Sequence, residues 1–255
     1  MKLNAILAAA ALSLASVSAH AVYIDVSGDN GEDTLQDILN GITVGGDSSI
    51  DVNADQVNPS DLWINSDSGA SPTRWVASIA GYASQNKFGI YDPKDPGNQF
   101  TIFDGQTEGN APFSWGLDSD GSVWADGYGT TGGFGDTGTT FSSTTFGFFL
   151  ETPNTTFFSQ TGLNPDESQQ MVAFNGGNGD YIDLPGFGGN TKWTEGGWVL
   201  AWEDILYEES DKDFNDLVVF IESIVPVPEP GTLALLGLGI GGLAAARRRQ
   251  SRKEA

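Results

Sequence analysis

The residues best suited to chemistry form an acidic segment near the end of the chain. Asp211, Asp213 and Asn215 alternate at positions i, i+2 and i+4, so oxygen-bearing side chains recur within a few residues. Hard cations such as calcium take roughly six to eight oxygen ligands, which carboxylates and amides supply. The pattern therefore predicts one calcium site, with the candidate ligands Glu203, Asp204, Asp211, Asp213, Asn215 and Asp216.

The acidic segment differs from an EF-hand loop. Glu222 falls eleven residues after Asp211, where an EF-hand places its bidentate ligand, but Asp216 occupies the sixth position, which requires glycine. Residues 217–221 are apolar and rich in β-branched side chains, which favours a strand. Two interpretations stay open: a calcium site at a turn or strand end, and a polar turn whose Asp and Asn side chains cap their own backbone.

Two other acidic clusters are weaker candidates. One contains Asp51, Asn53 and Asp55, and the other is the segment Asp-Ser-Asp-Gly at residues 118–121. The first lacks a following glycine, and the second has a composition typical of turns. We expect turns at both, with metal binding as the alternative.

Short strands must position the acidic residues. Between clusters of Gly, Asn, Asp and Pro, the predicted strands are Trp75–Ile79, Lys87–Tyr91, Phe100–Phe103, Thr145–Leu150, Gln170–Phe174, Trp198–Trp202 and Leu217–Ile221. They recur over residues 22–225 without a linker, which predicts an all-β chain with a single β-sandwich or jelly-roll-like domain. Because the last strand alternates incompletely, we expect both of its faces to be buried.

The rest of this domain has less regular patterns. Residues 32–39 predict one short helix, capped by Asp29 or Asn30. Residues 104–145 hold many Gly, Thr, Ser and Asp residues and predict long loops or irregular strands. The proline-rich segment 225–230 is expected to end the sheet, since proline lacks the N–H that a strand ladder needs.

Composition excludes several classes of function. The chain has 34 acidic and 11 basic residues; 32 and 5 of them lie within residues 22–228, for a net charge near −27. Such a charge repels nucleic acid and anionic membrane surfaces and favours soluble cations. The chain has no cysteine and its one histidine is His20, so residues 22–228 hold no thiol nucleophile, Ser-His-Asp triad or ordinary zinc site.

These exclusions leave three kinds of function. We expect a non-enzymatic surface or matrix protein with structural calcium. The alternative is a carbohydrate-binding module in which Trp115 and Trp124, in loop-like surroundings, offer flat faces to sugar rings, while the other tryptophans fill the core. A glycan-cleaving enzyme with two catalytic carboxylates is the third, although no pair stands out among the acids.

Both ends of the chain carry sorting features. Residues 1–21 have one lysine, an apolar core and the small-x-small site Ala19-His20-Ala21, which predicts a signal peptide and a mature start at Val22. Residues 232–246 are uncharged and as a helix would span about 22 Å, less than the ~30 Å bilayer core. The basic residues that follow favour the cytoplasmic side, so this short transmembrane helix would hold an exported domain transiently at the inner membrane.

The tail, residues 226–255, resembles the PEP-CTERM sorting signal of Gram-negative bacteria. The resemblance rests on an apolar segment between two motifs, with the residues Pro228, Glu229, Pro230, Arg247, Arg248 and Arg249. It implies handling by an exosortase, a membrane protease that releases the protein or transfers it outward. It also implies a setting of extracellular polysaccharide and biofilm matrix.

Residues of about 145–223 are similar to the DUF4114 domain. The similarity rests on Phe146-Gly147-Phe148-Phe149-Leu150, Asn164-Pro165, Met171–Phe174 and the acidic segment from Glu203 to Val219. Residues 86–92 and 102–105 also resemble the front half of PEP-CTERM proteins with this domain. The resemblance implies a β-rich surface module without established catalysis, and it strengthens the expectation of calcium at the acidic segment.

Overall fold

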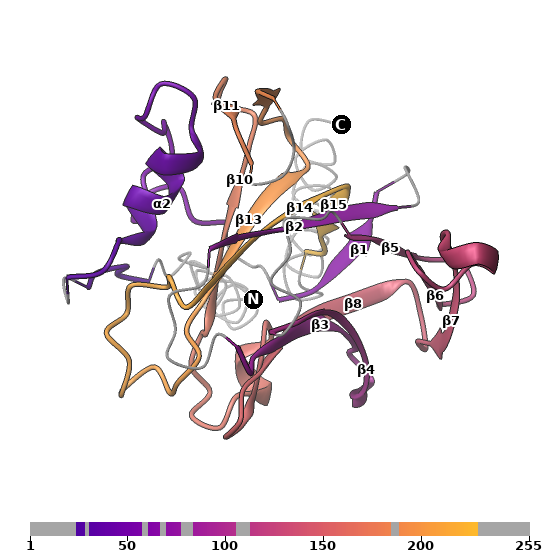
Figure 1. The fold of residues 1–255 in the computed structure, drawn as a ribbon. Helices are drawn as coiled ribbons and strands as arrows, with labels where there is room; N and C mark the ends of the chain where they lie inside the picture. Colours follow the sequence, from indigo (N-terminus) through magenta and orange to yellow (C-terminus); the bar gives the residue numbers. More distant parts are fainter. Residues whose placement is uncertain are drawn as a thin grey trace, which may run out of the picture.

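Two antiparallel sheets packed face to face form the body of the domain (Figure 1). This computed structural model describes residues 24–28, 31–57, 61–66, 70–77, 84–105, 113–184 and 189–228. Apart from one α-helix and two short 3-10 helices, the regular structure of these residues is β. The prediction of an all-β chain is confirmed.

The six-stranded sheet has the order β15-β1-β8-β3-β4, and β9 pairs with β8. Its central strands β3 and β8 are buried almost throughout. The strands of this sheet are β1 (Trp63–Asn65), β3 (Lys87–Asp92), β4 (Asp95–Asp104), β8 (Thr145–Glu151), β9 (Thr156–Phe158) and β15 (Ile224–Pro226).

The seven-stranded sheet has the order β10-β13-β14-β2-β5-β6-β7. Its strands are β2 (Ser71–Ala77), β5 (Phe113–Leu117), β6 (Ser122–Ala125), β7 (Gly135–Thr140), β10 (Met171–Asn175), β13 (Gly197–Trp202) and β14 (Leu217–Glu222). The remaining elements are the strand pair β11 (Tyr181–Ile182) and β12 (Thr191–Lys192), α2 (Leu35–Ile42), η1 (Thr130–Gly132) and η2 (Thr161–Leu163).

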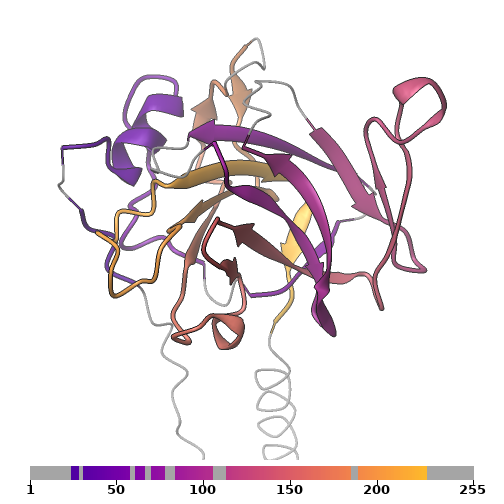
Figure 2. The ribbon, with the colours of Figure 1, turned by 60° about the horizontal axis from the view of Figure 1, so that its bottom comes forward.

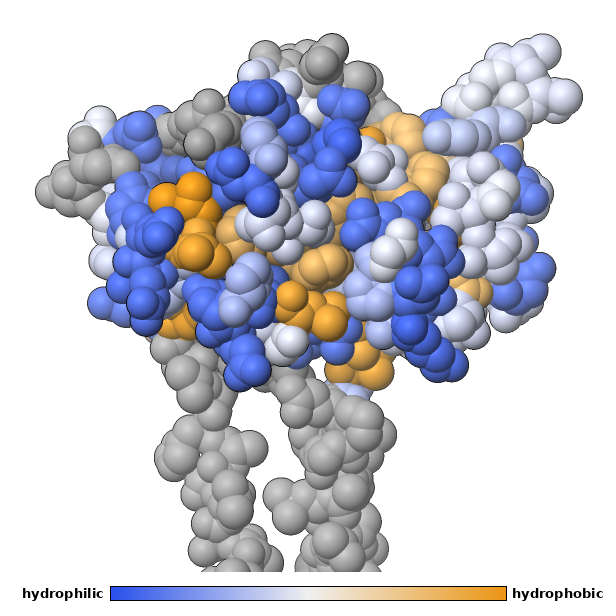
Figure 3. All heavy atoms as spheres, turned by 90° about the horizontal axis from the view of Figure 1, so that it is seen from below, coloured by the Kyte–Doolittle hydropathy of each residue, from blue (hydrophilic) through white to orange (hydrophobic). Residues whose placement is uncertain are grey.

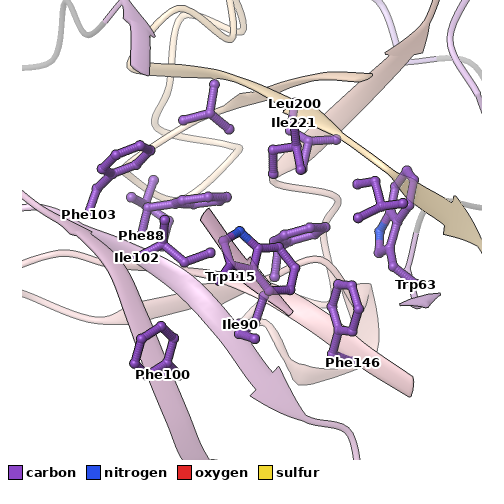
Figure 4. Packing of buried hydrophobic residues seen from close by; sticks show 14 of the residues in the cluster. Trp63, Phe88, Ile90, Phe100, Ile102, Phe103, Trp115, Phe146, Leu200 and Ile221 are labelled. Carbon is purple, nitrogen blue, oxygen red and sulfur yellow. The ribbon is translucent and has the colours of Figure 1, made fainter. Parts of the chain in front are cut away.

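An aromatic core fills the space between the two sheets (Figure 4). Trp115 and Phe146, from opposite sheets, meet edge to face with ring centroids 5.2 Å apart, and Trp63 meets Trp198 in the same way at 4.9 Å. The buried indole N–H of Trp115 donates to Thr73 Oγ1 at 2.6 Å. Each fully buried aromatic side chain stabilises the fold by roughly 1.5–3 kcal/mol, so this cluster holds the two sheets together.

A second core lies on the outer face of the seven-stranded sheet. α2 covers that face with its buried residues Leu35, Ile38, Leu39 and Ile42. The strands β10, β13 and β14 contribute to both cores. In β14, Val219 and Ile221 belong to the core between the sheets, while Val218 and Phe220 belong to the core beneath α2. Both faces of the last long strand are therefore buried, as its sequence predicts.

Two local predictions are wrong, and a third, which offered loops or irregular strands for residues 104–145, is correct only in its second alternative. The helix begins at Leu35 rather than residue 32, because Thr34 caps it in a capping box with Asp37. Residues 104–145, expected to be loops or irregular strands, hold β5, β6 and β7, which lie at one end of the seven-stranded sheet in Figure 1. Pro226 belongs to a strand, which it can because β15 is an edge strand that pairs only with β1.

The predicted signal peptide, residues 1–21, and the tail beyond Pro228 lie outside the described residues. Within the residues that the structure describes, no helix is long and apolar enough to cross a membrane.

Candidate metal centre

The acidic segment lies on the loop that joins β13 to β14. These strands pair antiparallel, with Trp202 opposite Leu217, so the residues after β13 return beside those before β14. The backbone N–H of Asp204 donates to Asp216 Oδ2 at 2.8 Å and closes the base of the loop. Residues 203–204 and 215–216 are thereby brought together.

The N-terminal segment docks on this loop. The Ser27 N–H donates to the Lys212 carbonyl at 2.9 Å, and Asn215 Nδ2 donates to the Asp33 carbonyl at 2.8 Å. Figures 1 and 2 both show the indigo N-terminal segment beside the orange loop between β13 and β14. Two parts of the chain that are far apart in sequence therefore share one surface.

Three carboxylates meet at this junction, and we call Glu32, Asp211 and Asp213 the outer acidic group. One carboxylate oxygen from each residue lies within 4.8 Å of the other two. Glu32 and Asp211 are exposed, whereas Asp213 is 3% exposed. Burial, together with the smaller effects of the charges of Asp211 and Glu32, raises the pKa of Asp213 to about 6. The group combines one buried ligand with two that face solvent.

The backbone of the loop is held in an uncommon conformation. Lys212 and Phe214 have φ angles of 65° and 54°, a left-handed region that residues other than glycine seldom adopt. The Asp213 carboxylate stabilises this turn, since Oδ1 accepts the Asn215 N–H at 3.1 Å and Oδ2 accepts Asn215 Nδ2 at 2.6 Å. Such strain persists where the surroundings hold it, and it is often found at functional sites.

Lys212, the basic residue of the loop, contacts an aromatic ring. Lys212 Nζ lies 4.7 Å from the centroid of the Tyr207 ring, in a cation–π contact. Among the described residues, Lys87 and Glu151 form a salt bridge within the six-stranded sheet. Lys212 is therefore engaged by an aromatic ring of its own loop.

Glu203 is a buried carboxylate beside this group. Its Oε1 accepts the Phe214 N–H at 2.7 Å, and its Oε2 has no hydrogen-bond partner. The side chain is fully buried, and this burial raises the pKa of Glu203 to about 7, with smaller contributions from the charges of Asp213 and Asp211. In its ionised form Glu203 would be an incompletely solvated charge within the fold.

A second set of polar residues lies deeper, and we call Asn86, Asp204 and Asp216 the inner polar group. Asn86 Nδ2 donates to Asp204 Oδ2 at 2.8 Å, and Asn86 comes from the turn before β3. Burial raises the pKa of Asp216 to about 8, and the charge of Asp204 is the next largest cause. Burial also raises the pKa of Asp204.

The six candidate ligands thus do not surround a single point. Asp211 and Asp213 join Glu32 in the outer group, whereas Asp204 and Asp216 join Asn86 in the inner group. Asn215 organises the loop through the two hydrogen bonds of its Nδ2 atom. Neither Glu32 nor Asn86 was predicted, because both lie far from the acidic segment in sequence and no spacing pattern links them to it.

The two weaker acidic clusters form turns. Asp51 Oδ1 accepts the N–H groups of Asn53 and Ala54, and Asp120 Oδ1 accepts the Ser122 N–H. These bonds satisfy the local backbone in the manner of Asx turns. Within the described chain, the outer acidic group is the set of three acids whose ligand atoms approach closely enough to share a metal.

The two tryptophans proposed for sugar binding have different surroundings. Trp115 is fully buried in the aromatic core, so the prediction that it contacts a glycan is wrong. Its position on β5, inside a segment expected to be loops, is the reason for the error. Trp124 is half-buried and stacks with Phe134 at 6.4 Å, and the pair lines a hollow of about 230 Å³ with Gly116, Leu117 and Asp118.

Comparison with known proteins identifies two segments of the chain. Residues 141–223 match the model of the domain of unknown function DUF4114, and residues 226–249 match the PEP-CTERM protein-sorting motif. The matched domain contains both ends of the acidic loop, while Glu32 and Asn86 lie before it. No curated protein and no solved structure matches the chain. The motif implies export and recognition by an exosortase, and the chain carries a segment similar to DUF4114 ahead of this sorting motif.

Proposed function

We propose that this chain is an exported, non-enzymatic surface or matrix protein whose β domain is clamped by a calcium ion at the outer acidic group. The observation that carries the proposal is the approach of Glu32, Asp211 and Asp213 within 4.8 Å. These oxygens come from two distant segments, so one ion would join the N-terminal segment to the loop that leads into β14. The cation would therefore cross-link these two segments of the folded chain.

The electrostatics of the group support this role. Two like charges about 5 Å apart repel by on the order of 1–3 kcal/mol at the dielectric of a protein surface. A divalent cation replaces this repulsion by attraction, and carboxylate oxygens are ligands that calcium prefers. An ion that binds only the folded state stabilises it by RT ln(1 + [Ca²⁺]/Kd), or about 2.7 kcal/mol at a hundredfold excess over Kd.

Export fits a site of this kind. Extracellular calcium modules bind with Kd values of roughly 0.1–1 mM, so the ion would load outside the cell and not in the cytoplasm. In the proposed sequence, the signal peptide is removed before Val22, the apolar segment 232–246 anchors the chain transiently in the inner membrane, and exosortase processing near Pro228 moves the folded domain outward. A polysaccharide-rich surface or biofilm matrix is the proposed destination.

A carbohydrate-binding module is the second candidate, and one observation favours it. Phe134 is 44% exposed and Tyr128 is 53% exposed. Both lie in the connection between β6 and β7, and Phe134 lines the hollow beside Trp124. Half-exposed aromatic rings beside a carboxylate are suited to sugar rings. Glycan-array binding that is lost in Trp124→Ala would support this function, whereas no binding to extracellular polysaccharides would exclude it.

Thermal unfolding tests the calcium clamp. We compare the full-length protein in mild detergent with millimolar calcium and with chelator, as wild type, Glu32→Gln and Asp213→Ala. Calcium should raise the Tm of the wild type, and the rise should be clearly smaller in either variant. Asp95→Asn, a change at an exposed acid at the start of β4, is the matched control and should respond as the wild type does.

The same thermal unfolding experiment can contradict the calcium clamp. If the Tm of the wild type is the same in calcium and in chelator, the outer acidic group is a polar junction without an ion. Intact mass and N-terminal sequencing of surface material test the sorting proposal separately. Stable surface protein that retains Arg247, Arg248 and Arg249 would contradict it.

A further inference from the structure

The inner polar group lies where the two sheets meet at one end of the domain. Asp204 follows β13 and Asp216 precedes β14, in the seven-stranded sheet, whereas Asn86 precedes β3, in the six-stranded sheet. The Asn86 carbonyl accepts the Gly105 N–H at 2.8 Å, which fixes Asn86 to the end of β4. Polar side chains from both layers therefore converge at a place that the aromatic core does not fill.

Asn86 leaves one oxygen of this group unsatisfied. Its side chain is 1% exposed and its Oδ1 has no hydrogen-bond partner. The orientation of the amide is fixed, because Nδ2 must face the carboxylate of Asp204, to which it donates. An oxygen without a donor is therefore buried on the same amide whose nitrogen contacts Asp204, a residue that is itself 5% exposed.

Glu203 adds a second oxygen of the same kind. Its Oε2 is also buried without a hydrogen-bond partner, and its charge is among those that raise the pKa of Asp216. A buried acceptor that lacks a donor costs about 1–3 kcal/mol, so two such oxygens in one region require an explanation. A cation satisfies several oxygens at once, which a single proton cannot do.

We propose that Asn86, Asp204 and Asp216 form a second site for a hard divalent cation, distinct from the outer acidic group. The donors are all oxygens, two of them carboxylates and one a carboxamide, which is a set suited to calcium rather than to softer metals. Because Asn86 belongs to one sheet and the two aspartates to the other, the ion would tie the sheets together at this end.

The two proposed calcium ions would join different parts of the chain. The outer ion would join the N-terminal segment to the acidic loop, and the inner ion would join that loop to the turn before β3. Each depends on one residue that the other does not use, namely Glu32 for the outer site and Asn86 for the inner site. The two sites can therefore be removed one at a time.

The number of calcium ions bound per chain tests both sites directly. Full-length protein in mild detergent is dialysed to equilibrium against millimolar calcium, and bound metal is determined by elemental analysis. We expect two ions per chain for the wild type and for the control Asp95→Asn, one for Asn86→Ala, and one for Glu32→Gln. One ion in the wild type with no loss in Asn86→Ala would overturn the inner site and leave the outer clamp standing. Retention of both ions in Glu32→Gln would overturn the outer clamp alone.

A second variant, Asn86→Asp, tests the inner site even if Asn86→Ala does not fold. Asn86→Asp is isosteric and places a third carboxylate in the group. If a cation binds there, the rise in Tm that calcium causes should be larger in Asn86→Asp than in the wild type, and the inner Kd should fall severalfold. If only hydrogen bonds or a buried water occupy the region, the added charge will lower Tm equally with and without calcium, and the inner site is overturned.

Discussion

Glu203→Gln should stabilise the calcium-free protein at alkaline pH and destabilise the calcium-loaded one. The carboxylate is fully buried, with one oxygen bonded to Phe214 N and the other without a donor. Gln keeps an oxygen for the Phe214 N–H and removes the charge. The change therefore isolates the effect of a buried negative charge beside the two proposed cations.

The magnitude follows from the pKa of Glu203, which burial raises from its usual 4.5 to about 7. A carboxyl group whose pKa is higher in the folded state binds more protons there, so its stabilising effect is present below pH 4.5 and is lost as the pH rises through 7. At pH 8 the full shift corresponds to about 3 kcal/mol. The unpartnered amide of Gln costs about 1–3 kcal/mol at every pH, so the pH dependence is the clean signal.

The assay is thermal unfolding of the wild type and Glu203→Gln at pH 5 and pH 8, in chelator and in calcium. For a domain of this size 1 kcal/mol changes Tm by roughly 2–4 °C. About 2.5 kcal/mol of the shift falls between pH 5 and pH 8, so in chelator the Tm of the variant relative to the wild type should rise by about 5–10 °C over this interval. In calcium the advantage at pH 8 should vanish or reverse. A Tm difference that is the same at both pH values would refute the reasoning, since it would mean that Glu203 titrates alike in both states.

Three further predictions concern the elements around the site. Thr34→Ala removes the cap of α2 and should lower stability by about 1 kcal/mol, measured by urea unfolding, and no change would contradict the role of the capping box. Gly28→Ala places a Cβ 2.4 Å from that of Asp213, whereas Gly31→Ala, also at positive φ, meets nothing within 4 Å; only the first should weaken calcium binding in a titration, and equal effects would show that backbone strain alone is responsible. Lys87→Met breaks an ion pair with Glu151 in which both side chains are 39% exposed, so Tm should change by less than the equivalent of about 1 kcal/mol.

The strands that carry the cores could be predicted from sequence because their patterns are local. The runs over Trp198–Trp202 and Leu217–Ile221 are short, apolar and bounded by turn residues, and they match β13 and β14 to within one residue. β5 to β7 were not predicted individually because their glycine and threonine content resembles that of loops. Their pairing with β2 and with one another, which is a tertiary effect, makes them strands.

The candidate site could be predicted only in part, because only some of its residues are close to one another in sequence. The acidic loop is contiguous in sequence, so its carboxylates were identified together. Glu32 and Asn86 reach it through the docking of the N-terminal segment and through the packing of one sheet on the other. Such partners depend on the whole fold, and no local spacing encodes them.

The visible surface accords with a module that works through defined sites rather than a broad apolar face. The side shown in Figure 3 is largely hydrophilic, and hydrophobic residues occur on it in small separate groups. Contiguous apolar patches are typical of protein or membrane docking surfaces.

The most direct test of the calcium clamp is a crystal structure of the protein grown in millimolar calcium, with the anomalous signal used to locate the ion. The proposal predicts a calcium peak about 2.3–2.6 Å from carboxylate oxygens of Glu32, Asp211 and Asp213. A well-ordered junction with no anomalous peak among these three residues would contradict it.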